Sequence, residues 1–187
     1  MDSTLFRSFA RRLKRQKHSG RNSENKTGGS KKSYFFESLS TRILSNTCMK
    51  FQYWPVLGFD TTQKLVLRPM LEIELFTNGK SITIAALVDS GADGCLFNIG
   101  YAQELGLNLK RAKTKSYTGI SGPPIAGYIL DVSLRVKHID KVVTIPIAFV
   151  ESQNVDALLG QTGFFDAFRI KFEKDHNLFE VNPTPKK

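Results

Sequence analysis

An apolar, β-branched segment of strand length, residues 82–88, runs directly into a carboxylate at Asp89. These residue types predict a buried strand, and Ser90, Gly91 and Ala92 predict a tight turn after it. An ionised carboxylate at the end of an apolar element is costly unless the protein uses it there. Gly91 allows a sharp turn and a close backbone approach, and the Ser90 hydroxyl can hold the loop. The segment therefore predicts a strand that presents an acid; the plain alternative is a carboxylate that only caps the turn.

Short strands separated by frequent turns account for most of the remaining sequence. The alternating segment 65–76 leads to Asn78-Gly79, a strong signal for a two-residue hairpin loop, and residues 81–88 form the returning arm. The other expected elements, in chain order, are a helix over 100–107 closed by Gly106, strands over 127–136 and 141–150, a short helix from Gly163 to Phe168, and strands over 169–172 and 178–181. This pattern predicts a mainly β protein, a small closed β-barrel with one or two short helices.

The charge of the chain is concentrated at its N-terminus. Of the net charge of +10, residues 1–33 carry +8, because they hold ten Lys or Arg against Asp2 and Glu24. A chain of 187 residues with 41% hydrophobic residues can support one core. The sequence therefore predicts a basic and flexible N-terminal tail and linker over residues 1–50, and one folded domain over residues 51–187.

The basic tail contains a candidate amphipathic helix over residues 4–17. Its apolar residues fall on one helical face among arginines: Leu5, Phe6, Phe9 and Leu13. Such a helix could contact nucleic acid, an anionic membrane or an import receptor, whereas a charge run is more commonly a solvated tail. The aromatic triplet at 34–36 follows the linker and could dock on the domain.

No transmembrane segment and no secretory signal are expected, because no apolar run has the required length. The two cysteines, Cys48 and Cys95, are too few for a disulfide framework, which favours a reduced, cytoplasmic environment. The basic amphipathic segment leaves organelle targeting open. The three histidines, His18, His138 and His176, lack metal-ligand spacing, so no zinc site is expected.

Two further motifs follow Asp89 in the sequence. The glycine-rich segment 117–122 lies between two expected strands, and residues 157–162 read Ala-Leu-Leu-Gly-Gln-Thr. Together with Asp89-Ser90-Gly91-Ala92, these motifs resemble the retropepsin-like aspartic proteases over about residues 51–182. The first motif is similar to the catalytic Asp-(Thr/Ser)-Gly-Ala signature of that family, the second lies where the family has its flap, and the third resembles the hydrophobic-hydrophobic-Gly element before its short C-terminal helix.

The resemblance implies a homodimeric aspartic endopeptidase with one pepsin-like lobe per chain. The family's chemistry needs two carboxylates that share a proton, and this chain has one such motif. Asp89 from each subunit would then meet at the two-fold axis, and Ser90 would form a hydrogen bond across the base of the dimer. The substrate would be a peptide or protein, with no metal or organic cofactor. The alternative is an inactive dimerisation or peptide-binding module that keeps the barrel and the basic tail.

The resemblance also implies which residues bind substrate. Asp93 matches the family position that binds the substrate backbone, but Gln161 stands where its usual arginine partner is expected, which leaves the orientation of Asp93 open. The implied flap consists of two glycine hinges and the residues between them: Gly119, Ile120, Ser121 and Gly122, with Ile120 near the tip. The plain alternative for this segment is an ordinary hairpin turn. Because clefts of this family favour large apolar residues beside the scissile bond, the enzyme could also trim its own tail near residues 34–36.

Overall fold

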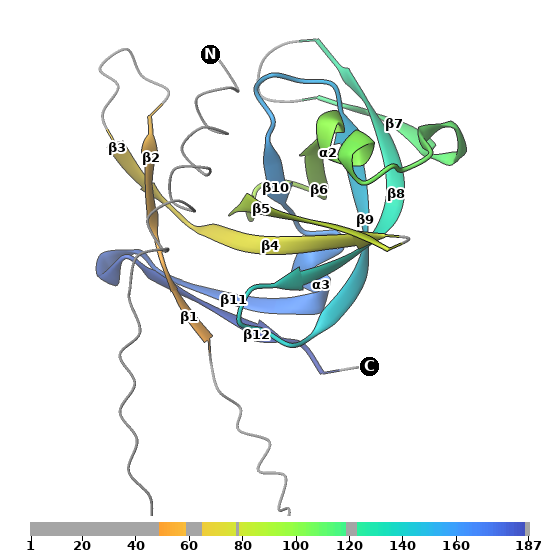
Figure 1. The fold of residues 1–187 in the computed structure, drawn as a ribbon. Helices are drawn as coiled ribbons and strands as arrows, with labels where there is room; N and C mark the ends of the chain where they lie inside the picture. The colour runs from red at the N-terminus through yellow and green to blue at the C-terminus, as the bar shows by residue number, and fades with distance from the viewer. Residues whose placement is uncertain (1–48, 59–64, 78, 119–122, 186–187) are drawn as a thin grey trace, which may run out of the picture. The chain divides into compact units, whose positions relative to one another are not determined.

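A seven-stranded sheet forms the centre of the described structure, a computed structural model that describes residues 49–58, 65–77, 79–118 and 123–185. These residues all belong to one compact unit of the chain. The order of the strands is β4 (Met70–Thr77), β5 (Lys80–Val88), β10 (Ala157–Leu159), β6 (Cys95–Asn98), β9 (Val142–Val150), β8 (Ile125–Val136) and β7 (Lys113–Tyr117). A further pairing of β4 with β8 closes the first six strands into a barrel (Figure 1). The expected mainly β closed barrel is confirmed.

Two short α-helices accompany the barrel within the described residues, as expected. Helix α2 (Ile99–Glu104) begins where the Asn98 side chain accepts a hydrogen bond from Gly100 N at 2.9 Å. It ends before Gly106, whose φ of +69° is a conformation that glycine adopts at little cost. Helix α3 (Phe164–Ala167) follows β10. Two 3₁₀ turns, η1 (Leu109–Arg111) and η2 (Lys174–His176), complete the helical elements of the described residues.

The expected hairpin before Asp89 is confirmed. Strands β4 and β5 pair antiparallel up to Thr77 and Lys80, which leaves a two-residue loop, and Gly79 in this loop has a φ of +80°. The alternating segment before the hairpin is divided, however: Pro69 lies between β3 (Leu65–Arg68) and β4. Proline has no N–H for a strand ladder, which explains the break. Strand β3 pairs instead with β2 (Trp54–Leu57) in a separate hairpin.

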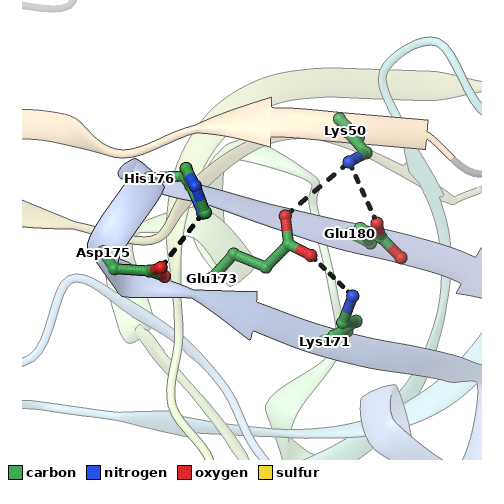
Figure 2. A network of polar contacts seen from close by, with 6 residues as sticks. All are labelled: Lys50, Lys171, Glu173, Asp175, His176 and Glu180. Atoms are coloured by element: carbon green, nitrogen blue, oxygen red, sulfur yellow. Dashed lines mark hydrogen bonds and ion pairs between the residues drawn. The ribbon is translucent and has the colours of Figure 1, made fainter.

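A three-stranded sheet is built from β1 (Met49–Gln52), β12 (Leu178–Pro183) and β11 (Phe168–Glu173). The hairpin of β11 and β12 was expected, whereas β1 was not. One face of this sheet packs on the core through Phe179 and Val181, both fully buried. The other face carries cross-strand ion pairs, which Figure 2 shows: Lys50 Nζ lies 3.3 Å from Glu180 Oε1 and 3.6 Å from Glu173 Oε2. Alternation along the strands separates the two faces.

The barrel interior is filled by apolar side chains from every strand of the closed ring. The largest fully buried side chains of the described residues are Phe97, Phe149, Phe164, Phe168, Phe179, Leu71, Ile73, Leu75, Leu105, Leu134, Ile147 and Leu159. Among the described residues, no helix has both the length and the apolarity required to cross a membrane. Residues 1–48 lie outside the described part of the chain, so the expectations for the basic tail and the domain boundary stay predictions.

Candidate active site

Asp89 directly follows the last residue of β5. At this point, backbone hydrogen bonds join the chain to the segments on both sides of it. On one side, Val88 N donates a hydrogen bond to the carbonyl of Pro69 at 2.9 Å. On the other, Asp89 N donates to the carbonyl of Leu159 at 3.0 Å, because β10 runs parallel to β5. Val88 is only 3% exposed, whereas Asp89 is half-buried. The barrel wall therefore holds the backbone of Asp89 while its carboxylate remains accessible.

A tight turn follows Asp89, as expected. Ala92 N donates to the carbonyl of Asp89 at 3.3 Å, and Gly91 N donates to Asp89 Oδ1 at 2.9 Å. Ser90 and Gly91 are exposed. The carboxylate thus accepts one backbone hydrogen bond, the contact that a turn-capping aspartate also makes. No other hydrogen bond to this carboxylate comes from the residues that the structure describes, so Oδ2 is available to a ligand or to a second carboxylate.

The segment after β10 lies directly against the Asp89 loop. Gln161 N donates to the carbonyl of Ala92 at 2.8 Å, and Thr162 N donates to the carbonyl of Asp93 at 2.9 Å. Gly160 makes this approach possible: a Cβ on it would lie 2.6 Å from the carbonyl carbon of Gly94 and 2.7 Å from the carbonyl oxygen of Ala92. The structure therefore brings together two of the motifs that the sequence analysis selected.

The side chain of Gln161 contacts Ser90 rather than Asp93. Its Nε2 donates to the Ser90 carbonyl at 2.8 Å. Asp93 is exposed, and within the described residues its carboxylate has no hydrogen-bond or ion-pair partner. Gln161, at the position where the resemblance implies an arginine, thus contacts the loop that carries Asp89, and the carboxylate of Asp93 has no partner among the described residues. Sequence reasoning identified Gln161 as unusual but did not find this contact.

A pocket of about 150 Å³ lies beside Asp93, and three strands contribute walls that sequence reasoning missed. Strand β7 supplies Lys115 and Tyr117, while Ile129 of β8 and Ala148 of β9 are cross-strand partners. The complete lining is Asp93, Gly94, Cys95, Lys115, Tyr117, Ile129, Pro146, Ala148 and Thr162. The only sequence signal for Ile129 and Ala148 is the alternation along their strands, which indicates which side chains of one strand share a face. Two larger cavities, of about 410 and 310 Å³, include neither Asp89 nor Asp93 in their linings.

Cys95 is a buried wall residue of this pocket and not a reactive thiol. It is 2% exposed, and its Sγ lies 3.7 Å from the carbonyl oxygen of Thr162. Burial raises the pKa of the Cys95 thiol, with smaller opposing effects from backbone hydrogen bonds of Gly160 and Phe164. A thiol that stays protonated is a poor nucleophile. Cys95 is therefore a packing residue in the wall of the pocket.

The flap residues Gly119, Ile120, Ser121 and Gly122 lie outside the described residues, so their expected role remains a prediction. The strands on either side of them are described: β7 and β8 pair antiparallel, with Tyr117 opposite Ile125. No group of three or more His, Cys, Asp or Glu side chains suited to a metal ion occurs in the part of the chain that the structure describes.

Comparison with known families agrees with this geometry. Residues 73–162 match the aspartyl protease family, and the match includes Asp89, Asp93 and the element around Gly160. This finding confirms the resemblance of the chain to the retropepsin-like aspartic proteases. None of the curated proteins compared with the chain matches it.

Three solved structures illustrate what the fold is similar to, each at 18% sequence identity. A retropepsin-like aspartic protease from Rickettsia conorii has a TM-score of 0.47, with 73% of this chain and 95% of that chain covered. The retroviral protease-like domain of Ddi1 from Leishmania major has a TM-score of 0.43, with coverages of 62% and 94%. The EIAV protease in complex with the inhibitor HBY-793 has a TM-score of 0.37, with coverages of 50% and 81%.

Proposed function

We propose that this protein is an aspartic endopeptidase in which Asp89 from each of two subunits activates a water molecule. The observation that carries this proposal is the local geometry of Asp89. Its backbone is fixed at the end of β5 by a hydrogen bond to Leu159, while its half-buried carboxylate accepts only the Gly91 amide among the described residues. This is the presentation that acid–base chemistry requires: a fixed backbone and an accessible carboxylate.

Two copies are needed because the chain has one acid of this type. Two neighbouring carboxylates do not both ionise readily, so they share a proton. The ionised one removes a proton from water as the water oxygen attacks the carbonyl carbon of the substrate, and the protonated one donates to the carbonyl oxygen. Collapse of the tetrahedral intermediate breaks the C–N bond. The carboxyl group that took the water proton gives it to the leaving amine, and the other carboxylate takes back a proton from a hydroxyl of the intermediate as the product carboxyl group forms. Ser90 then supports the pair by a hydrogen bond between subunits, and Gly91 and Ala92 shape the turn.

The substrate would lie across the loop that carries Asp89. The carboxylate of Asp93 is free to accept a hydrogen bond from a substrate N–H, and the neighbouring pocket of about 150 Å³ can receive a side chain. Its walls are mostly apolar, so the part of a substrate side chain that enters it would be apolar. Lys115 also lines the pocket and adds one positive charge to it. The segment from Gly119 to Gly122 would close over the bound peptide as the flap.

The decisive experiment compares Asp89→Asn with wild type on a peptide library. The amide keeps the shape of the side chain but cannot act as the base, so cleavage should fall by about 100-fold or more. Asp131→Asn is the matched control, because Asp131 is exposed on β8. Equal cleavage by Asp89→Asn and wild type would refute the assignment. Peptide binding without any cleavage by wild type would instead support the inactive module.

A further inference from the structure

The side chain of Gln161 reaches Asp89 through a single peptide group. Gln161 Nε2 donates to the carbonyl oxygen of Ser90 at 2.8 Å. That carbonyl belongs to the peptide unit that links Ser90 to Gly91, and the N–H of the same unit donates to Asp89 Oδ1 at 2.9 Å. The described chain has no cis peptide bonds, so the carbonyl and the N–H of this planar unit point in opposite directions. One peptide unit thus joins Gln161 on one side to Asp89 on the other.

We propose that Gln161 is a positioning residue that orients the Asp89 carboxylate through the Ser90–Gly91 peptide unit. The proposal rests on the proposed function, in which Asp89 is the catalytic acid. A hydrogen bond to the Ser90 carbonyl fixes the rotation of the peptide plane, and this rotation decides whether the Gly91 N–H points at Asp89. The bond also polarises the peptide unit, which strengthens its N–H as a donor.

Among the described residues, the only other hydrogen bond on this peptide unit is the one from Gly91 N to Asp89 itself, so the bond from Gln161 is the restraint that comes from outside the turn. Gly91 has no side chain and can adopt many backbone conformations, and both Ser90 and Gly91 are exposed. Gln161, by contrast, is anchored: its own N–H bonds the Ala92 carbonyl at 2.8 Å, and Gly160 before it lies tightly against Gly94. The anchored segment around Gln161 therefore restrains the turn at Ser90 and Gly91 through this hydrogen bond.

The expected effect is moderate because the Gln161 side chain is exposed and water can replace part of its hydrogen bond. Losing one neutral hydrogen bond corresponds to a rate change of about 3- to 10-fold. The loss should appear in kcat rather than in KM, because the contact acts on the catalytic carboxylate and not on the substrate. A contact that only stabilised the fold would change the thermal midpoint and leave kcat of the folded enzyme unaltered.

The test uses Gln161→Met in the full chain, which keeps the length of the side chain and removes the donor. Gln103→Met is the matched control, because Gln103 is an exposed glutamine on helix α2. We expect kcat about 3- to 10-fold lower for Gln161→Met, with KM and the thermal midpoint close to wild type, and no change for the control. An amide NMR spectrum gives a readout without activity: the Gly91 amide proton should shift upfield in Gln161→Met only.

The outcomes separate this inference from the proposed function. Wild-type kcat together with an unchanged Gly91 amide signal in Gln161→Met would overturn the inference, even if Asp89→Asn abolishes cleavage. A wild-type protein that cleaves no peptide would refute the proposed function, yet the Gly91 amide would still show whether Gln161 orients the turn. A fall in kcat that is matched by Gln103→Met would also overturn the role of Gln161.

Discussion

Replacing Gly160 by alanine should separate the two loops that form the candidate active site. The added Cβ would lie 2.6 Å from the Gly94 carbonyl carbon and 2.7 Å from the Ala92 carbonyl oxygen, and it would also overlap the Gly94 carbonyl oxygen. Carbon contacts are favourable only at about 3.5–4.0 Å. All three atoms belong to backbone, so no flexible side chain can move aside, and the segments must separate.

The cost can be worked from the contacts that this separation disturbs. Overpacking alone costs about 1–3 kcal/mol. Separation also weakens the hydrogen bonds from Gln161 N to Ala92 and from Thr162 N to Asp93, at about 1 kcal/mol each. We therefore expect Gly160→Ala to lower the free energy of unfolding by about 3–5 kcal/mol, which lowers Tm by about 10–17 °C for a domain of this size.

The assay is thermal and denaturant unfolding of Gly160→Ala beside Gly94→Ala. Gly94 lies in the same contact, but a Cβ on it would have only the Thr162 Cβ within 4 Å, at an ordinary 3.9 Å. We expect Gly94→Ala to remain within about 1 kcal/mol of wild type, since a tolerated alanine also restricts the unfolded chain. Equal stability of the two variants would refute the claim that Gly160 is required for close approach.

Three further outcomes are expected. If two Asp89 side chains form the site, specific activity should fall on dilution below the dimer dissociation constant and its pH profile should be bell-shaped; an active monomer in sedimentation would contradict this. A hydrogen bond from Lys171 lowers the pKa of Glu173 below its ordinary value of 4.5, with Lys50 contributing through charge. The stabilising contribution of ionised Glu173 is therefore present above pH 4.5 and is lost as the pH falls through the lower pKa of the folded state. Glu173→Gln should therefore lose less stability than wild type on acidification. An equal fall of Tm with pH in the variant and in wild type would refute this prediction. Intact-mass analysis should show wild type, but not Asp89→Asn, trimmed near residues 34–36; a tail that persists in active enzyme would rule out self-processing.

The sequence by itself determined the features whose signals act over a few residues. The apolar run before Asp89 and the small residues after it predicted a strand and a turn, and both are present. Asn78-Gly79 predicted the hairpin loop, and Gly106 predicted the end of the first helix. These predictions succeeded because hairpin turns, helix caps and strand alternation depend on the local backbone, which neighbouring residue types largely decide.

Only the tertiary structure decided which distant segments meet at Asp89. Strand β10 lies parallel to β5, so Leu159 binds Asp89 and Gln161 reaches Ser90, although 71 residues separate Gln161 from Ser90. Likewise β1 pairs with β12 at the far end of the described chain. A parallel or long-range pairing leaves no local pattern, because the two strands lie far apart in the sequence and the packing of the whole domain decides which strands become neighbours. The resemblance to a family selected the element around Gly160, but the close approach that requires a glycine there and the direction of the Gln161 amide followed only from the folded backbone.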